Sequence, residues 1–222
     1  MQNLAISIRI SDDLFIKDPE STDLGKRIIS NSIELLDELG FEAFTFKKLG
    51  AAIGSPESSV YRYFESKHKL LIYLMCWYWS WIEYKIVFGT INKSSDVDRL
   101  KIAIEILTKP IKVDNAFIHV NEVLLNKIVI SEATKVFHTK DVDKENDQGY
   151  FAVYKRIVQR VSELILAINP SYKYPNMLVT TVIEGAHQQG YFVDHLPSIT
   201  DKKRGKNRVY NFYSDLVSKM IS

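Results

Sequence analysis

The sequence predicts an all-α protein in which an N-terminal helix-turn-helix precedes a larger helical domain. Six prolines and nine glycines in 222 residues leave room for long uninterrupted helices. Apolar residues recur at helical spacing from Asp23 almost to the C-terminal end. Between residues 45 and 64, two short helical segments flank a turn that contains glycine, which is the spacing of a helix-turn-helix.

The first 22 residues follow a different pattern. Apolar and polar residues alternate from Ile6 to Ile10, which is the period of a strand, and Asp12 and Asp13 suit a turn. We therefore expect a short hairpin or an extended arm over residues 1–22 that packs against the next helix.

Capping signals divide the following stretch into four helices. Gly40 stands where the first helix needs a left-handed residue to end, and Thr45 suits the N-cap of the second. Ser55 and Pro56 suit the cap and first position of the third, and Ser66 caps the fourth. The expected helices cover residues 23–39, 46–53, 56–64 and 67–91.

Five further apolar stripes at helical spacing follow, the last over residues 209–220. The only clearly polar connection covers residues 139–148, where four acidic residues alternate. A calcium loop needs a central glycine that this segment lacks, so we expect a solvated loop. The predicted organisation is an arm over residues 1–22, a helix-turn-helix domain over 23–68 and a regulatory and dimerisation domain over 69–222.

Composition restricts the class of protein further. The net charge is only +2, whereas residues 45–70 carry five basic and two acidic side chains, a local charge of +3. Binding of an anionic polymer is therefore expected from this local surface. The single cysteine, Cys76, excludes an internal disulfide and lies in an apolar run, as a buried residue would. We find no signal peptide and no apolar run of the ~18 residues that span a membrane, and we expect a cytoplasmic protein.

The second motif helix has side chains suited to a DNA groove. Val60 and Phe64 are four residues apart and are expected to anchor the helix to the domain. The hydroxyl and basic side chains between them remain to approach phosphates and base edges of double-stranded DNA.

Several residue groups in this stretch resemble the TetR family of bacterial regulators. They are Gly40-Phe41-Glu42-Ala43-Phe44-Thr45, Leu49, Ala52, Ile53-Gly54, Ser59-Val60-Tyr61-Arg62-Tyr63-Phe64, Ser66-Lys67 and Leu70-Leu71. The resemblance implies a non-enzymatic regulator of transcription, most simply a repressor, that binds a palindromic operator as a homodimer. It also implies dimerisation through the last two helices and a small ligand in the C-terminal domain. Departures from the family pattern are Gly50, which replaces alanine, Ser55-Pro56, and His68.

Candidate DNA-binding residues follow from the resemblance together with the side-chain chemistry. They are Thr45, Lys47, Lys48, Glu57, Ser58, Ser59, Tyr61, Arg62, Tyr63 and Lys67. Glu57 suits a cytosine amino group or, equally, the dipole of its own helix. We expect Lys67 to contact a phosphate, because the N-terminal amides of the fourth helix would face the same backbone. Arg9 and Lys17 in the arm are alternative contacts with DNA. The basic run over 202–208 is expected to be a solvated loop, with a contact to nucleic acid or to an acidic partner as the alternative.

The larger domain offers candidates for ligand binding and dimerisation. Trp77, Trp81 and Tyr84 share one helix face, where they form either core packing or the wall of a pocket for a hydrophobic or aromatic ligand. The remaining candidate pocket residues are His119, Glu122 and Tyr154. Candidate dimer residues are Gly185, Phe192, Val209, Phe212, Leu216 and Val217.

Two other functions remain open at this stage. A DNA-binding architectural or protein-partner factor of the same fold would need no ligand pocket. A small helical enzyme would need converging catalytic groups, and no nucleophile, phosphate loop or carboxylate pair stands out in the sequence. His119 with Glu122 and Glu184 with His187 have a spacing that metal ligands use, but such pairs are usually ordinary helix contacts, so we expect no metal or cofactor.

Overall fold

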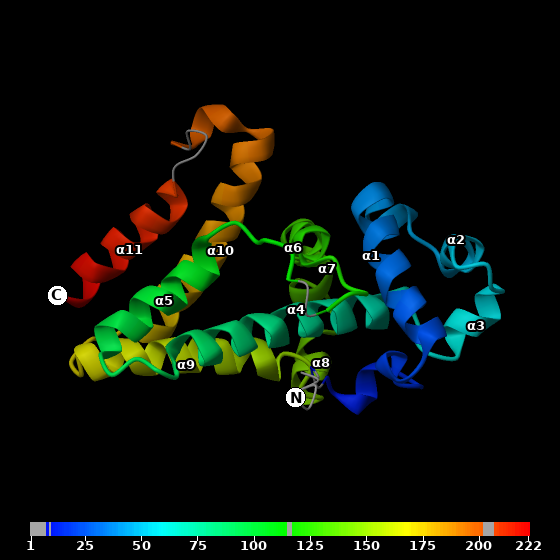
Figure 1. Cartoon of the computed structure of the whole chain (residues 1–222), viewed down its shortest axis with the longest axis horizontal. Coiled ribbons are helices and arrows are strands. Elements are labelled where there is room, and N and C mark those ends of the chain that lie inside the picture. Colours follow the sequence, from blue (N-terminus) through cyan, green and yellow to red (C-terminus); the bar gives the residue numbers. More distant parts are fainter. Residues whose placement is uncertain (1–7, 9, 115–116, 202–206) are drawn as a thin grey trace, which may run out of the picture. The chain divides into compact units, whose positions relative to one another are not determined.

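The computed structural model describes residues 8, 10–114, 117–201 and 207–222, and every regular element in these ranges is a helix (Figure 1). The elements are η1 (Asp12–Leu14), η2 (Pro19–Ser21), α1 (Asp23–Ala43), α2 (Phe46–Ala52), α3 (Glu57–Tyr61), α4 (Lys67–Thr90), α5 (Asp96–Thr108), α6 (Glu122–Ser131), α7 (Thr134–Phe137), α8 (Val142–Asp147), α9 (Ala152–Ile168), α10 (Pro175–His195), η3 (Pro197–Ile199) and α11 (Arg208–Ile221). The predicted all-α fold is confirmed.

Contacts divide the chain into two compact units. The first unit contains residues 1–80 and 111–152, and the second contains residues 81–110 and 153–222. Helices α6, α7 and α8 therefore pack in the same unit as the helix-turn-helix, and α4 contributes to both units. The functional boundary after residue 68 stays a prediction.

Caps fix the ends of the first helices as the sequence predicts. Thr22 Oγ1 accepts a hydrogen bond from the Gly25 amide, and Thr45 Oγ1 accepts one from the Lys48 amide. Gly40 adopts a φ of 72° where α1 turns toward α2. These side chains satisfy amides that the first turn of a helix leaves without partners.

The third helix is shorter than predicted and starts differently. Pro56 has an extended backbone (ψ 149°) and is itself the N-cap, so Ser55 does not cap α3. The helix ends at Tyr61, and the Tyr63 amide instead donates to the Val60 carbonyl. The prediction that this helix reaches Phe64 was therefore wrong by about one turn.

The core of the first unit surrounds the N-terminal part of α4. Residues 70–79 of that helix are all buried, which accounts for their apolar character on every side. Helix α6 packs along α1, which contributes Ile28, Ile29 and Ile33 to the core. Cys76 is buried as predicted, and burial raises the pKa of its thiol to about 12.

Two sequence predictions for this unit need correction. The acidic segment around Glu145 is not a solvated loop: it contains α8, and Glu145 is buried with its Oε1 2.7 Å from His68 Nε2. In the arm, residues 1–7 and 9 lie outside the described residues. The part that is described contains no strand, and Asp12 begins the short helix η1. The arm packs on its own unit as predicted, with Leu14 only 1% exposed.

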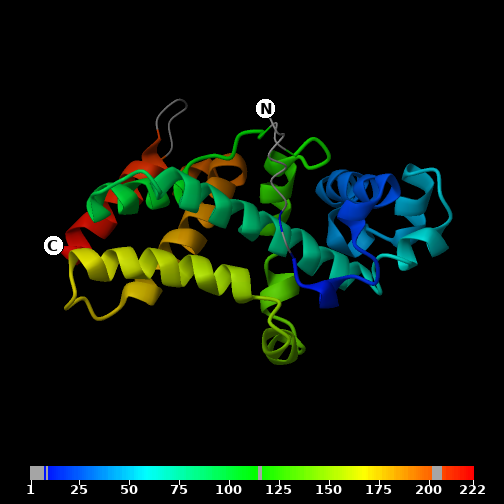
Figure 2. The ribbon, with the colours of Figure 1, turned by 60° about the horizontal axis from the view of Figure 1, so that its bottom comes forward.

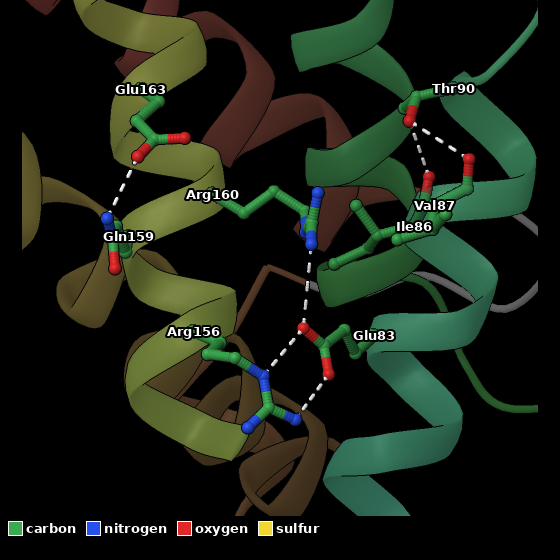
Figure 3. A network of polar contacts seen from close by, with 8 residues as sticks. All are labelled: Glu83, Ile86, Val87, Thr90, Arg156, Gln159, Arg160 and Glu163. Carbon is green, nitrogen blue, oxygen red and sulfur yellow. Dashed lines mark hydrogen bonds and ion pairs between the residues drawn. The ribbon is translucent and has the colours of Figure 1, made fainter. Parts of the chain in front are cut away.

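The second unit is held together by apolar helix packing and by a polar link. Helices α5, α10 and α11 contact one another. The C-terminal part of α4 lies beside α9 (Figure 2), where Glu83 accepts two hydrogen bonds from Arg156, at 2.8 and 3.1 Å. Figure 3 shows Arg160 directed at the same carboxylate, 3.7 Å away. One partly buried acid thus holds two arginines of α9 against α4.

No helix in the described ranges has the length and apolar character needed to cross a bilayer. Of the basic run over 202–208, residues 202–206 lie outside the described residues. Arg208 begins α11 and donates to the Asp201 carbonyl at 2.8 Å.

Candidate nucleic-acid interface

Helix α3 exposes polar side chains on one side, and buried apolar side chains attach it to the domain. Val60 and Phe64 are fully buried and anchor the motif as predicted. Ser58, Tyr61 and Arg62 are exposed, at spacings of three and four residues, which places them on one side of the helix. This side is available to enter a groove.

Helix α2 adds positive charge beside this face. Thr45, Lys47 and Lys48 are exposed near its N-terminal end. The Lys48 ammonium donates to the Ala43 carbonyl at 2.8 Å, which places its charge near the start of the helix. The Tyr61 ring contacts the Phe46 ring edge-on, with centroids 4.9 Å apart, so α2 supports the exposed tyrosine.

The approach of α2 to α3 depends on Gly50. A β-carbon at this position would lie 2.7 Å from the Ser55 carbonyl oxygen and 3.1 Å from the Glu57 amide nitrogen. The Ser55 amide also donates to the Gly50 carbonyl at 2.9 Å. The departure from alanine at this position therefore has a structural reason: the turn passes against the helix where a side chain would stand.

Two candidate DNA-binding residues lie inside the domain. Ser59 is 5% exposed, and its hydroxyl accepts a hydrogen bond from Arg62. Tyr63 is 3% exposed, and its hydroxyl lies 2.7 Å from Thr22 Oγ1. Because both side chains are buried, they can hold α3, the recognition helix of the motif, in position, but they do not face a base edge.

Lys67 also has an internal role. Its ammonium donates to the Phe41 carbonyl at 2.9 Å and to the carbonyls of Glu42 and Phe44 at 3.3 Å. Carbonyls at a helix C-terminal end lack partners within the helix, and a cation there is stabilising. Lys67 thus joins the start of α4 to the turn between α1 and α2 through three hydrogen bonds to backbone carbonyls.

Residues at the end of α6 and in α7 also contact this turn. The sequence did not predict these contacts. Glu132, at the C-terminal end of α6, accepts a hydrogen bond from the Phe41 amide at 3.1 Å. Lys135 of α7 forms an ion pair with Glu42, which lowers the pKa of the Glu42 carboxyl. Partners separated by about 90 positions leave no periodic signal in a single sequence.

The candidate pocket residues divide between the two units. In the first unit, Trp77 is buried against Phe117 and Glu122 accepts from the Asp114 amide at 3.2 Å. His119 pairs with Glu20 at 2.9 Å, so His119 and Glu122 serve different partners. In the second unit, Trp81 is fully buried, Tyr84 stacks on Phe88, and Tyr154 donates to Glu184 at 2.9 Å.

The candidate dimer residues also divide, here between core and surface. Val217 is 3% exposed and belongs to the core. Gly185 faces Tyr213 of its own chain, whose hydroxyl oxygen would lie 2.0 Å from an added β-carbon, so this glycine serves packing within the chain. Phe212 is 59% exposed. Phe192, Val209 and Leu216 are partly exposed.

Comparison with known proteins agrees with this geometry. Residues 28–74 match the model of the family described as bacterial regulatory proteins, tetR family. A comparison with curated protein sequences finds no match.

Several solved structures share the fold at low sequence identity. A bacterial regulatory protein in the tetR family from Rhodococcus RHA1 is 12% identical, with a TM-score of 0.64 over 90% of this chain and 98% of that one. AibR in complex with isovaleryl coenzyme A and operator DNA is 13% identical, with a TM-score of 0.60 over 86% and 97%. The superantigen PfiT is 15% identical, with a TM-score of 0.60 over 91% and 97%. These likenesses concern the fold alone.

The chain is an all-helical protein with a DNA-binding helix-turn-helix at its N-terminal end. It is a DNA-binding regulator of transcription whose residues 28–74 match the tetR family of bacterial regulatory proteins.

We predict that Gly50→Ala destabilises the first unit although alanine is the better helix former. The gain in helix propensity is about 1 kcal/mol, whereas forcing a methyl group against backbone atoms costs about 1–3 kcal/mol. Urea unfolding measures the balance. Ala51→Gly, at an exposed position of the same helix, is the control and should lose only the propensity. A more stable Gly50→Ala protein would contradict the close approach.

We predict that Lys67→Met lowers the free energy of unfolding in the absence of DNA. Methionine keeps the apolar stem and removes three hydrogen bonds to carbonyls, two of them partly buried, at a cost of about 1–3 kcal/mol. Lys47→Met, at an exposed position, should change it by less than about 0.5 kcal/mol. Equal stability of the two variants would contradict the structural role of Lys67 and leave a phosphate contact as its expected role.

Proposed function

We propose that the protein is a repressor that binds a palindromic operator as a homodimer and leaves it when a small ligand binds. The α3 face carries the first part of the proposal, because its exposed hydroxyl, phenol and guanidinium groups stand on a fully buried base beside two exposed lysines. Such a face suits base edges, while the lysines suit phosphates.

The residues proposed to contact DNA are revised by their exposure. Ser58, Tyr61, Arg62 and Glu57 face a base edge or the adjoining backbone, and Thr45, Lys47 and Lys48 face the phosphates. Ser59, Tyr63 and Lys67 act by holding the motif, because Ser59 and Tyr63 are buried and the Lys67 ammonium donates to three carbonyls of the turn between α1 and α2.

We assign the homodimer contact to the outer face of α10 and α11. One apolar stripe of α11 faces the core and consists of Tyr213, Val217 and Ile221. A second apolar stripe is partly or fully exposed and consists of Phe212, Leu216 and Met220. Phe212 and Met220 are 59% and 49% exposed. A second copy of this stripe would remove it from water.

The ligand proposal rests on aromatic side chains and on a relative. Trp77 in the first unit suits an apolar ligand, and Trp81 and Tyr154 offer a separate candidate contact in the second unit. AibR, which shares the fold, has been solved with isovaleryl coenzyme A and operator DNA, which supports an acyl thioester as the first class to test. The alternative is a ligand-free architectural or protein-partner factor of the same fold.

Operator binding should be specific in sequence and steep in salt. After selection of DNA fragments from a random library, fluorescence anisotropy should show that Lys47→Ala with Lys48→Ala reduces the salt slope by about 4 without changing the preferred sequence, because the dimer loses two lysines from each protomer. Ser58→Ala and Arg62→Ala should change the preference. Lys101→Ala, on α5, is the control and should bind as the parent does. A parent protein that prefers no fragment would reject the function.

The dimer should separate when its exposed stripe is charged. Phe212→Lys with Met220→Lys should give monomers in sedimentation, because two ammonium groups cannot be desolvated at an apolar contact without large cost. Ser218→Lys, on another exposed side of α11, should leave the dimer intact. Dimers that survive the double change would place the interface elsewhere.

An effective ligand should change the fluorescence of Trp77 or Trp81 and weaken operator binding together. A coupling of about 1–3 kcal/mol corresponds to a loss of roughly 5–150-fold in operator affinity, and operator DNA must weaken ligand binding by the same factor. Isovaleryl and longer acyl coenzyme A esters are the first compounds to titrate. Binding that leaves operator affinity unchanged would favour the ligand-free alternative.

A further inference from the structure

Residues 10–22 precede the segment that matches the tetR family model and lie against the end of its recognition helix. We name these residues the N-terminal strap. The Ile16 amide donates to the Tyr63 carbonyl at 2.8 Å, and Thr22 Oγ1 lies 2.7 Å from the Tyr63 hydroxyl. The Lys17 ammonium lies 5.3 Å from the centre of the Tyr63 ring. Three strap residues therefore hold one residue, two positions after α3 ends.

Apolar contacts fasten the strap to its unit. Leu14 is 1% exposed, and the Phe15 ring meets the Tyr73 ring edge-on at 6.1 Å. Pro19 lies so close to α1 that a β-carbon on Gly25 would be 2.2 Å from its carbonyl oxygen. A terminal segment frays unless it is tied down, and this one is tied at several points.

Glu20 joins the strap to two further parts of the unit. Its carboxylate oxygens lie 2.9 and 3.0 Å from His119 Nε2. It also accepts a hydrogen bond from the Tyr73 hydroxyl, and burial together with the charges of Glu20 and Asp18 raises the pKa of that tyrosine. The Glu20 and His119 side chains are 30% and 21% exposed, so water screens their interaction less than that of a fully exposed pair.

His119 belongs to the short segment that leads into α6. Two residues earlier, the Phe117 ring packs edge-on against Trp77 at 5.1 Å. Val120 is 4% exposed, and Asn121 caps α6 by accepting from the amides of Val123 and Leu124. A shift of Phe117 or of the first turn of α6 would therefore also move His119.

We propose that the strap holds the recognition helix in its DNA-binding position, and that the Glu20–His119 pair makes operator affinity depend on the conformation of residues 117–120. Glu20 and His119 are positioning residues in this account, since neither belongs to the exposed face of α3. The part that concerns operator affinity rests on the proposed function.

The first test is a double-mutant cycle on operator affinity with Glu20→Gln and His119→Gln. Glutamine keeps an acceptor for Tyr73 at position 20 and a polar side chain at position 119, while the two changes remove the carboxylate and the imidazole respectively. Each single change should weaken operator binding about five- to tenfold, and the double change should be no weaker than the worse single, because both remove one interaction.

A matched pair provides the control. Lys127 of α6 and Asp37 of α1 also bring opposite charges together in this unit, 3.9 Å apart, and neither belongs to the strap. Lys127→Gln and Asp37→Asn should leave operator affinity within about twofold of the parent. Additive losses in the Glu20 and His119 cycle, or equal losses in the control pair, would overturn the proposed coupling.

A readout without DNA separates this proposal from the proposed function. Hydrogen exchange of the Ile16 amide reports the bond to Tyr63, and Glu20→Gln and His119→Gln should each accelerate it several-fold relative to amides of α1. Faster exchange with unchanged operator affinity would overturn the strap's role while leaving the function intact. If the parent binds no operator, the function fails, and unchanged Ile16 exchange would then overturn the attachment as well.

Lys17→Ala distinguishes positioning from direct contact. It removes a charge from the strap and leaves the Glu20–His119 pair in place, so operator affinity should fall by less than in either glutamine variant. A large loss with a reduced salt slope would identify the strap as a DNA contact and overturn its positioning role.

Discussion

A helix of five residues is too short to hold its conformation in water by itself, and α3 has this length. The shape of the candidate DNA-binding face must therefore come from what surrounds α3. Val60 and Phe64 supply apolar anchoring, Gly50 permits the close approach of α2, and Tyr63 is held by the strap. Stability at this site is tertiary, so changes well away from α3 reach it through packing.

Polar contacts complement that packing where the motif meets the rest of its unit. Lys67 and Glu132 satisfy carbonyls and an amide of the turn between α1 and α2, and Glu20 joins the strap to His119. From the sequence these residues would be expected to be solvated charges on the surface, but in the structure each has a defined partner. These contacts join the helix-turn-helix to segments elsewhere in its unit.

Sequence patterns predicted the elements well where the signal was local. Gly40, Thr45 and Ser66 mark helix ends because each acts on a neighbouring amide or turn. Predictions failed where distant partners decided the outcome. The acidic segment at Glu145 folds into α8 because His68 compensates a buried carboxylate, and Tyr63 turns inward because Thr22 offers a hydroxyl. Gly185 accommodates the Tyr213 side chain of its own chain, a contact that no local pattern reports.

By itself, then, the sequence determined the class of fold, the position of the helix-turn-helix and its resemblance to the tetR family, because helical period and caps operate within a few residues along the chain. Tertiary structure alone decided which polar residues of the motif face solvent and which hold it in place. Ser58 and Tyr61 face outward, whereas Ser59 and Tyr63 are buried, although all four side chains carry hydroxyl groups. Burial depends on neighbours brought together by folding, and no spacing within a single sequence reports it.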